Sequence, residues 1–206
     1  MYKRQVQYLE KTDQLENTIF VFTTDHGDMM GDHGFLAKGC MHYDAAIRTP
    51  MIVSGKGIQP GVISQRLSSS LDLFPTICDW VGTDPRPPLE GKSFAGACRG
   101  ESTDKGWPAV TVQFNQAQSI ITDDHWRMTL FQGAGLGQIF DLNADPQEQR
   151  DLYHVADANP KHLELVERHA RAYMESHQLH HYRNLPVSDG HRCLVQGNFE
   201  LTPCPW

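Results

Sequence analysis

The segment "TIFVFTTDHGDMMGDHGFLAKG", from Thr18 to Gly39, decides the fold that this chain of 206 residues is expected to adopt. It opens with an apolar run, residues 18–23, that is rich in β-branched and aromatic side chains and lacks polar alternation. Such a run is typical of a strand that is buried on both faces of a parallel sheet. Because ligands lie at the carboxyl ends of the strands in open α/β sheets, the polar residues after this run are the first candidate site.

Those polar residues are two acid–imidazole pairs, Asp25–His26 and Asp32–His33, followed by Lys38. The carboxylate of Asp25 and the imidazole of His26 are suitable ligands for one divalent cation. Carboxylates favour Ca²⁺, Mg²⁺ or Mn²⁺, and an imidazole shifts the preference toward Mn²⁺ or Zn²⁺. The alternative interpretation is a polar turn in which the aspartate caps a helix.

The residues around this pair bear on whether it can act as a site. Adjacent residues of a strand point to opposite faces, so Asp25 and His26 reach one ion only if the backbone turns, which Gly27 permits. The ammonium of Lys38 suits a tetrahedral oxyanion, although a lone lysine is more often a solvated surface group. His42 belongs to no such pattern and is expected to be an ordinary surface or helix histidine.

Further elements are predicted on either side of this segment. Apolar residues at a helical period indicate a helix over residues 2–16. Residues 51–55 form a second short apolar run and predict another buried strand. A helix is expected over residues 69–82, with Ser70 as its N-cap.

The character of the sequence changes after a proline-rich stretch near residue 85. Four short strand-like runs, separated by Gly, Asn or Asp, predict an antiparallel meander. Residues 159–177 show the clearest helical pattern. The apolar stripe of that helix is predicted to comprise Leu163, Val166, Ala170 and Tyr173.

Composition excludes several classes of function. The net charge of −7 and the lack of a basic cluster argue against a nucleic-acid partner. No apolar run approaches the roughly 20 residues of a membrane-spanning helix, and the N-terminus has no apolar core like that of a secretory signal. The five cysteines are widely spaced and form no C-x-x-C pair, so reduced thiols in a cytoplasmic protein are expected. A Cys193–Cys204 bridge is the alternative.

Several motifs together resemble the sulfatase family, a branch of the alkaline phosphatase superfamily. They are the strand that ends in Asp-His-Gly, the lysine that follows, "YDAAIRTPMIV", "SSLDLFPTICDWVG" with "LEGKSF", and "IFDLNADPQEQRDLY". The resemblance covers about residues 1–178. It implies an α/β fold: part of an alkaline-phosphatase-like sandwich with a mainly parallel sheet, then a small antiparallel sheet packed with a C-terminal helix.

The resemblance also implies regions and residue roles. Residues 1–84 would belong to the catalytic α/β domain, 85–180 to the small sheet-and-helix subdomain and 181–206 to an irregular tail. In the metal site, Asp25 and His26 would bind one divalent ion, with Ca²⁺ as the first choice and Mn²⁺, Mg²⁺ or Zn²⁺ as alternatives.

The remaining roles concern the substrate and the loops. Lys38 would be catalytic and would contact the sulfate, and His33 would bind substrate. Arg48 would form a structural ion pair with Asp44. The turn that begins at Asp145 would carry only turn and cap chemistry.

The family's nucleophile motif, C/S-x-P-x-R or C/S-x-A-x-R, is not found, and neither is its N-terminal aspartate pair. The chain therefore resembles a C-terminal portion that lacks the nucleophile-bearing half. The expected function is a metal-dependent sulfuric ester hydrolase that acts on a small-molecule ester, with no turnover by the isolated chain. Alternatives are a phosphonate or phosphate monoester hydrolase and a non-catalytic domain that pairs with a separate N-terminal half or forms a homo-oligomer.

Overall fold

The described residues of this computed structural model are 2–39, 41–84, 89–101, 106–131, 133, 136–158, 160–161 and 163–168. The chain separates into one unit from Met1 to Ser176 and a second from His177 to Trp206. The second unit lies outside the described residues, and so does the irregular tail expected over 181–206.

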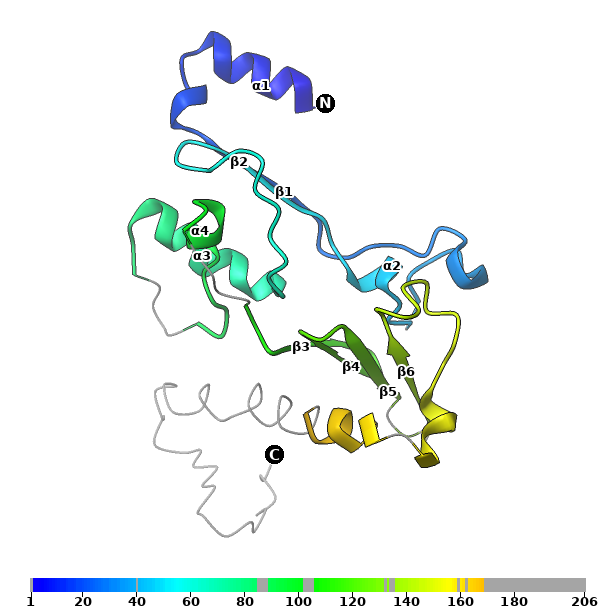
Figure 1. The fold of residues 1–206 in the computed structure, drawn as a ribbon. Coiled ribbons are helices and arrows are strands. Elements are labelled where there is room, and N and C mark those ends of the chain that lie inside the picture. The colour runs from blue at the N-terminus through cyan, green and yellow to red at the C-terminus, as the bar shows by residue number, and fades with distance from the viewer. Residues whose placement is uncertain are drawn as a thin grey trace, which may run out of the picture. The chain divides into compact units, whose positions relative to one another are not determined.

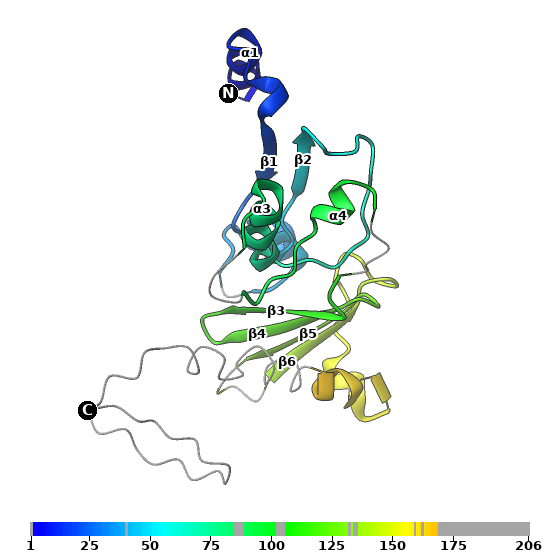
Figure 2. The same ribbon diagram turned by 90° about the vertical axis from the view of Figure 1, so that its left-hand side faces the viewer.

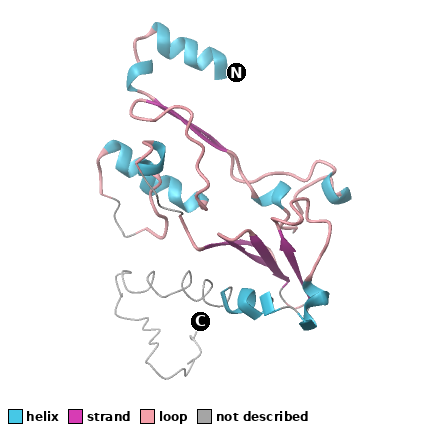
Figure 3. Cartoon of the chain, in the orientation of Figure 1, coloured by secondary structure: helices cyan, strands magenta, loops and turns pink. Residues whose placement is uncertain are grey.

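Short helices and two antiparallel sheets make up the described part of the first unit (Figure 1; Figure 3). The α-helices are α1 (Tyr2–Lys11), α2 (Asp44–Ile47), α3 (Leu73–Val81) and α4 (Ala95–Cys98). Turns of 3-10 helix are η1 (Leu15–Asn17), η2 (Asp32–Gly34), η3 (Ser70–Asp72) and η4 (Tyr153–Ala158). Residues 160–161 and 163–168 are also helical. The helices predicted over residues 2–16 and 69–82 are confirmed as α1 and α3. Helix α1 is shorter than predicted, because it ends at Lys11.

The first sheet corrects the prediction of a parallel, fully buried strand. Strands β1 (Ile19–Thr23) and β2 (Met51–Gly55) pair antiparallel, and the described residues contain no parallel sheet. Neither strand has a fully buried residue, and Phe22 and Ile52 are 42% and 61% exposed. The lack of polar alternation specifies neither strand direction nor what covers the strand, so the mainly parallel sheet stays a prediction beyond the described residues.

The second sheet is the predicted meander, and that prediction is confirmed. Strands β3 (Ala109–Phe114), β4 (Ala117–Thr122), β5 (Trp126–Phe131) and β6 (Leu136–Asp141) pair antiparallel in chain order (Figure 2). Successive side chains of a strand point to opposite faces, so the register defines two faces of this sheet. Both faces contain fully buried residues.

One face of the meander is apolar and packs against the helix that follows η4. Ile120, Met128 and Ile139 are cross-strand neighbours and form a cluster with Leu165 from that helix. Leu165 is fully buried, whereas Leu163 is 76% exposed. The predicted stripe through Leu163 is therefore wrong; two of its members, Ala170 and Tyr173, lie outside the described residues.

The other face of the meander is polar and aromatic, and it packs against the segment between β1 and β2. The imidazole Nδ1 of His42 lies 2.8 Å from Ser119 Oγ, which lies 2.7 Å from Thr129 Oγ1. His42 is 2% exposed, so the prediction of a surface histidine is wrong. Burial, followed by the charge of Arg127, lowers the pKa of His42 to about 4.

A buried ion pair between Arg127 and Glu148 lies on the same face. Both side chains are almost fully buried, and Arg127 also donates a hydrogen bond to the carbonyl of His42. The Arg127 guanidinium lies 5.2 Å from the ring centroid of Tyr43 and 4.9 Å from that of Phe140. Two strands of the meander and the turn after it therefore enclose the start of α2.

A second buried carboxylate, Asp72, holds the region around α3. Its side chain accepts hydrogen bonds from the amides of Ser69 at 3.1 Å and Lys92 at 2.7 Å, and from the indole of Trp107 at 3.0 Å. Ser69 and Asp72 form a reciprocal capping box, so the N-cap is Ser69 rather than the predicted Ser70. None of the helices in the described part of the chain is both long and apolar enough to cross a bilayer.

Leu165→Ala is expected to lower the free energy of unfolding by about 2–4 kcal/mol, because it removes a fully buried side chain from the apolar face. Leu163→Ala is the matched control, two positions away, and is expected to change this free energy by less than about 0.5 kcal/mol. Urea denaturation followed by circular dichroism measures both variants. Equal effects would contradict the placement of Leu165.

His42 is expected to make the protein sensitive to acid. Because folding lowers the pKa of this base, its contribution to stability is complete above about pH 6.5 and is lost as the pH falls toward 4. The loss amounts to at most about 3 kcal/mol. The variant His42→Asn has no titratable ring, so its unfolding free energy should fall less across this pH range. Parallel curves for the variant and the wild type would show that His42 does not titrate in this way.

Candidate functional site

The turn that follows β1 arranges the carboxylate of Asp25. The hydroxyl of Thr24 donates to Asp25 Oδ1 at 3.2 Å, and the amide of His26 donates to the same oxygen at 3.0 Å. These hydrogen bonds, with that from Thr24 as the largest cause, lower the pKa of Asp25. The carboxylate is therefore ionised at neutral pH, and Oδ2 is the oxygen that faces His26.

The same turn fixes the imidazole of His26. Its Nδ1 lies 2.6 Å from the carbonyl oxygen of Gly27. Because a carbonyl only accepts hydrogen bonds, Nδ1 carries a proton, and Nε2 is the ring nitrogen available to a metal ion. A backbone carbonyl that fixes the tautomer in this way is the usual arrangement of a metal-binding histidine.

The two free donor atoms, His26 Nε2 and Asp25 Oδ2, lie 3.6 Å apart. Two ligands of one divalent ion lie at most about 5 Å apart, since each is within about 2.0–2.6 Å of the ion. The side chains are 43% and 84% exposed, so an ion can reach them. This pair fits part of a metal site. Within the described residues, no third His, Cys, Asp or Glu joins it in a cluster.

Gly27 docks this turn on α2. Its amide donates to the carbonyl of Ala46 at 2.8 Å. A Cβ at position 27 would overlap the carbonyl oxygen of Ala45. Glycine is therefore needed here for close packing against α2, which adds a reason to the turn that the sequence suggested.

Lys38 is half-buried, and its ammonium lies 4.9 Å from the ring centroid of Phe114 at the end of β3. Among the described contacts of Lys38, none is an ion pair or hydrogen bond with Asp25 or His26. The carboxylate–imidazole pair is thus formed by the fold, whereas the role of Lys38 in contacting a sulfate stays a prediction.

His33 belongs to the packing between the loop and the meander. Its ring stacks on that of Tyr43, with centroids 3.8 Å apart and an angle of 12° between the planes. Tyr43 is buried and makes an edge contact with Phe140. The role of His33 in binding substrate therefore also stays a prediction.

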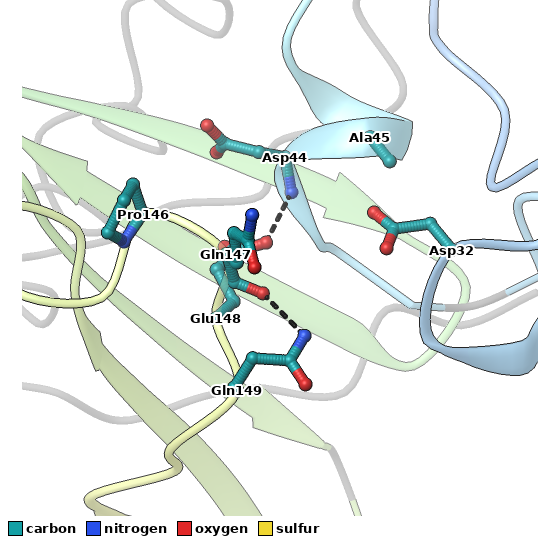
Figure 4. Close-up of a pocket in the computed structure, with 7 residues that line it drawn as sticks. All are labelled: Asp32, Asp44, Ala45, Pro146, Gln147, Glu148 and Gln149. Atoms are coloured by element: carbon teal, nitrogen blue, oxygen red, sulfur yellow. Dashed lines mark hydrogen bonds between the residues drawn. The ribbon is translucent and has the colours of Figure 1, made fainter.

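A pocket of about 320 Å³ opens beside α2 (Figure 4). Its lining comprises Asp32, Asp44, Ala45, Pro146, Gln147, Glu148 and Gln149. Burial, with smaller contributions from the charges of Asp44 and Asp32, raises the pKa of Glu148 to about 7, against the opposing charge of Arg127. The three acidic side chains in this lining, Asp32, Asp44 and Glu148, disfavour the binding of a sulfate group in this pocket.

Two further expectations concern the segments around this pocket. The predicted ion pair between Arg48 and Asp44 is confirmed, with 3.4 Å between Arg48 Nη1 and Asp44 Oδ2. The turn from Asp145 also forms as predicted, since its carboxylate accepts the amide of Arg150 at 2.7 Å. The buried role of Glu148 in that turn was missed, because a charged residue after Asp-Pro gives no sequence signal of burial.

Comparisons with known proteins find similarity to sulfatases. A model of the sulfatase family matches residues 2–83. The N-acetylglucosamine-6-O-sulfatase of Bacteroides thetaiotaomicron is 28% identical over 176 residues, which cover 80% of this chain and 31% of that protein.

Solved structures show the same fold. One, described as a complex with its substrate D-glucosamine-2-N,6-O-disulfate, has a TM-score of 0.76 at 25% identity over 89% of this chain and 38% of that one. The phosphonate monoester hydrolase of Agrobacterium radiobacter has a TM-score of 0.72 at 25% identity, with coverage of 84% and 38%. The chain spans less than half the length of each of these relatives. Residues 2–83 thus match the sulfatase family, and the chain as a whole is similar to parts of sulfatases and of a phosphonate monoester hydrolase.

Proposed function

We propose that this chain contributes a metal-binding segment to a hydrolase of sulfuric ester bonds. The observation that carries this proposal is the pair of free donor atoms, His26 Nε2 and Asp25 Oδ2, held 3.6 Å apart at the end of β1. The match of residues 2–83 to the sulfatase family supports the reaction class. The substrate would be a small-molecule sulfate ester, such as the sulfated amino sugar on which a structural relative acts.

The residues of this chain would act by holding and orienting groups. Asp25 supplies a carboxylate that stays ionised, and His26 would supply Nε2, because its Nδ1 donates to the Gly27 carbonyl. A divalent ion bound there would act as a Lewis acid toward a sulfuryl oxygen. Ca²⁺ is our first choice, with Mn²⁺, Mg²⁺ and Zn²⁺ as alternatives, because the pair mixes a hard oxygen with an imidazole.

Lys38 and His33 would act on the substrate. Lys38 would leave the ring of Phe114 and turn its ammonium toward the sulfate oxygens, where a point charge with three donors suits a tetrahedral anion. A cation–π contact at a partly exposed ring is worth only about 0.5–1 kcal/mol, so a bound sulfate would displace it readily. His33 would line the substrate side of the loop.

A second candidate function is hydrolysis of phosphonate or phosphate monoesters. The likeness to a phosphonate monoester hydrolase favours it, because a tetrahedral phosphoryl group presents similar oxygens to a metal ion and a lysine. The regions 1–84, 85–180 and 181–206, a cytoplasmic location and a homo-oligomer or separate N-terminal half remain predictions.

Metal binding tests the first half of this proposal. Isothermal titration of the purified chain with Mn²⁺ and Ca²⁺ is expected to show one site that Asp25→Ala and His26→Ala both abolish. Asp79→Ala, on the exposed surface of α3, is the matched control and should bind as the wild type does. Binding that survives both site variants would place the ion elsewhere.

Turnover tests the second half. We expect no hydrolysis of 4-nitrophenyl sulfate by the chain alone, and hydrolysis when the part of a sulfatase relative that this chain does not span is added together with the metal. Asp25→Ala should lower that rate at least about 100-fold, because the metal ion supplies several kcal/mol of charge stabilisation. Faster hydrolysis of 4-nitrophenyl phosphate would favour the second candidate, and no turnover in any mixture would favour a non-catalytic domain.

A further inference from the structure

The short helix α2 lies between the turn at Asp25–Gly27 and the meander, and it is too short to hold its own conformation. It has four residues, whereas isolated helices shorter than about 12 residues are marginal in water. Its N-cap, Tyr43, makes no capping hydrogen bond through its side chain. Contacts from elsewhere in the chain must therefore fix its position.

Glu148 provides the first of these contacts. Its Oε2 accepts the amide of Asp44, the first residue of α2, at 2.9 Å, across a separation of 104 positions in the sequence (Figure 4). A carboxylate at this place satisfies a free amide of the helix start and interacts favourably with the helix dipole. The acceptor that α2 lacks locally is thus supplied by the turn after β6.

Arg127 and Ser119 provide the others. Arg127 pairs with Glu148 and donates to the carbonyl of His42, so that one guanidinium joins the carboxylate to the segment before α2. Ser119 holds the imidazole of His42 at 2.8 Å. All these partners come from the meander or the turn that follows it.

Other residues of α2 contact the turn at Asp25–Gly27. Gly27 donates its amide to Ala46 at 2.8 Å, and its own carbonyl accepts from Nδ1 of His26 at 2.6 Å. A continuous series of contacts therefore leads from Glu148 through Asp44 and α2 to the imidazole. A change at Glu148 should reach His26 by this route.

The buried pair carries features that packing alone does not require. Glu148 has a backbone φ of 54°, in the left-handed region that non-glycine residues seldom adopt. Well-packed apolar residues often stabilise a protein core as much as a buried ion pair does. A charged pair with a strained backbone at this position is thus better explained by specific placement of its partners than by stability.

We propose that the Arg127–Glu148 pair positions the Asp25–His26 turn by fixing α2, and that Glu148 is a positioning residue of the metal site. The consequence for metal affinity rests on the proposed function. The consequence for the metal-free chain does not, because it concerns only how firmly Gly27 is held against α2.

Hydrogen exchange of the Gly27 amide, measured by NMR on the full chain without metal, tests the proposal directly. Glu148→Gln keeps the size and one acceptor oxygen of the side chain but removes its charge, and it is expected to accelerate exchange at Gly27 at least about tenfold. The matched control is Asp72→Asn, which alters a buried carboxylate bonded to the amides of Ser69 and Lys92, away from α2. In the control, the exchange rate of the Gly27 amide should keep its wild-type ratio to the exchange rates of the β3 amides. Unchanged exchange in Glu148→Gln, or equal acceleration in both variants, would overturn the proposal.

A milder variant decides the matter if Glu148→Gln does not fold. Arg127→Lys keeps the positive charge but lacks the guanidinium that pairs with Glu148 and donates to the carbonyl of His42, and it should accelerate exchange at Gly27 about threefold. No acceleration in that variant would overturn the proposal.

Mn²⁺ titration of the same variants separates this proposal from the proposed function. The dissociation constant should rise at least about tenfold in Glu148→Gln and stay unchanged in Asp72→Asn. If the wild type shows no Mn²⁺ binding that Asp25→Ala removes, the metal site fails, and the exchange at Gly27 still decides whether Glu148 positions the turn. Wild-type binding that Glu148→Gln leaves intact would overturn the positioning role.

Discussion

The contact between Gly27 and α2 is the constraint on which the candidate site depends. The amide of Gly27 bonds to Ala46, its missing side chain leaves room for the carbonyl of Ala45, and its own carbonyl fixes the tautomer of His26. Gly27 therefore sets the path of the backbone, the distance between this turn and α2, and which ring nitrogen of His26 faces Asp25. Asp25 then needs only the hydrogen bond from Thr24 and the amide of His26 to present its second oxygen.

The meander supports this contact because its two faces have different roles. The apolar face, with Met128 at its centre, packs against Leu165 and stabilises the sheet in the ordinary hydrophobic way. The polar face presents Arg127 and Ser119 to the segment before α2. Since neighbouring residues of a strand point to opposite faces, a single strand can serve both purposes. The sheet thereby joins the stability of the fold to the placement of the site.

Local patterns predicted local structure well. The meander was predictable because its strands are short, β-branched and separated by turn residues such as Asn115, which adopts a φ of 51°. The helix around residues 73–81 was predictable from its apolar period and its glycine stop. The pair Asp25–His26 was found because a short apolar run ends abruptly in an acid and an imidazole.

Features that depend on distant parts of the chain were not predictable in this way. The direction of β1 follows from its pairing with β2, and an apolar run without alternation does not encode it. The burial of His42 and of Glu148 was not predictable, because it arises from partners 77 and 104 positions away. The burial of Leu165 rather than Leu163 was likewise not predictable, because it depends on which side of the helix packs against the sheet.

The central claim is that Asp25 and His26 bind the same divalent cation. Anomalous scattering from a crystal of this chain soaked in Mn²⁺ tests it most directly. The account predicts one strong peak within about 2.0–2.6 Å of both Asp25 Oδ2 and His26 Nε2, with the imidazole still bonded to the carbonyl of Gly27 through Nδ1. A peak bound only by other residues, or an imidazole turned away with Nδ1 toward the ion, would contradict it.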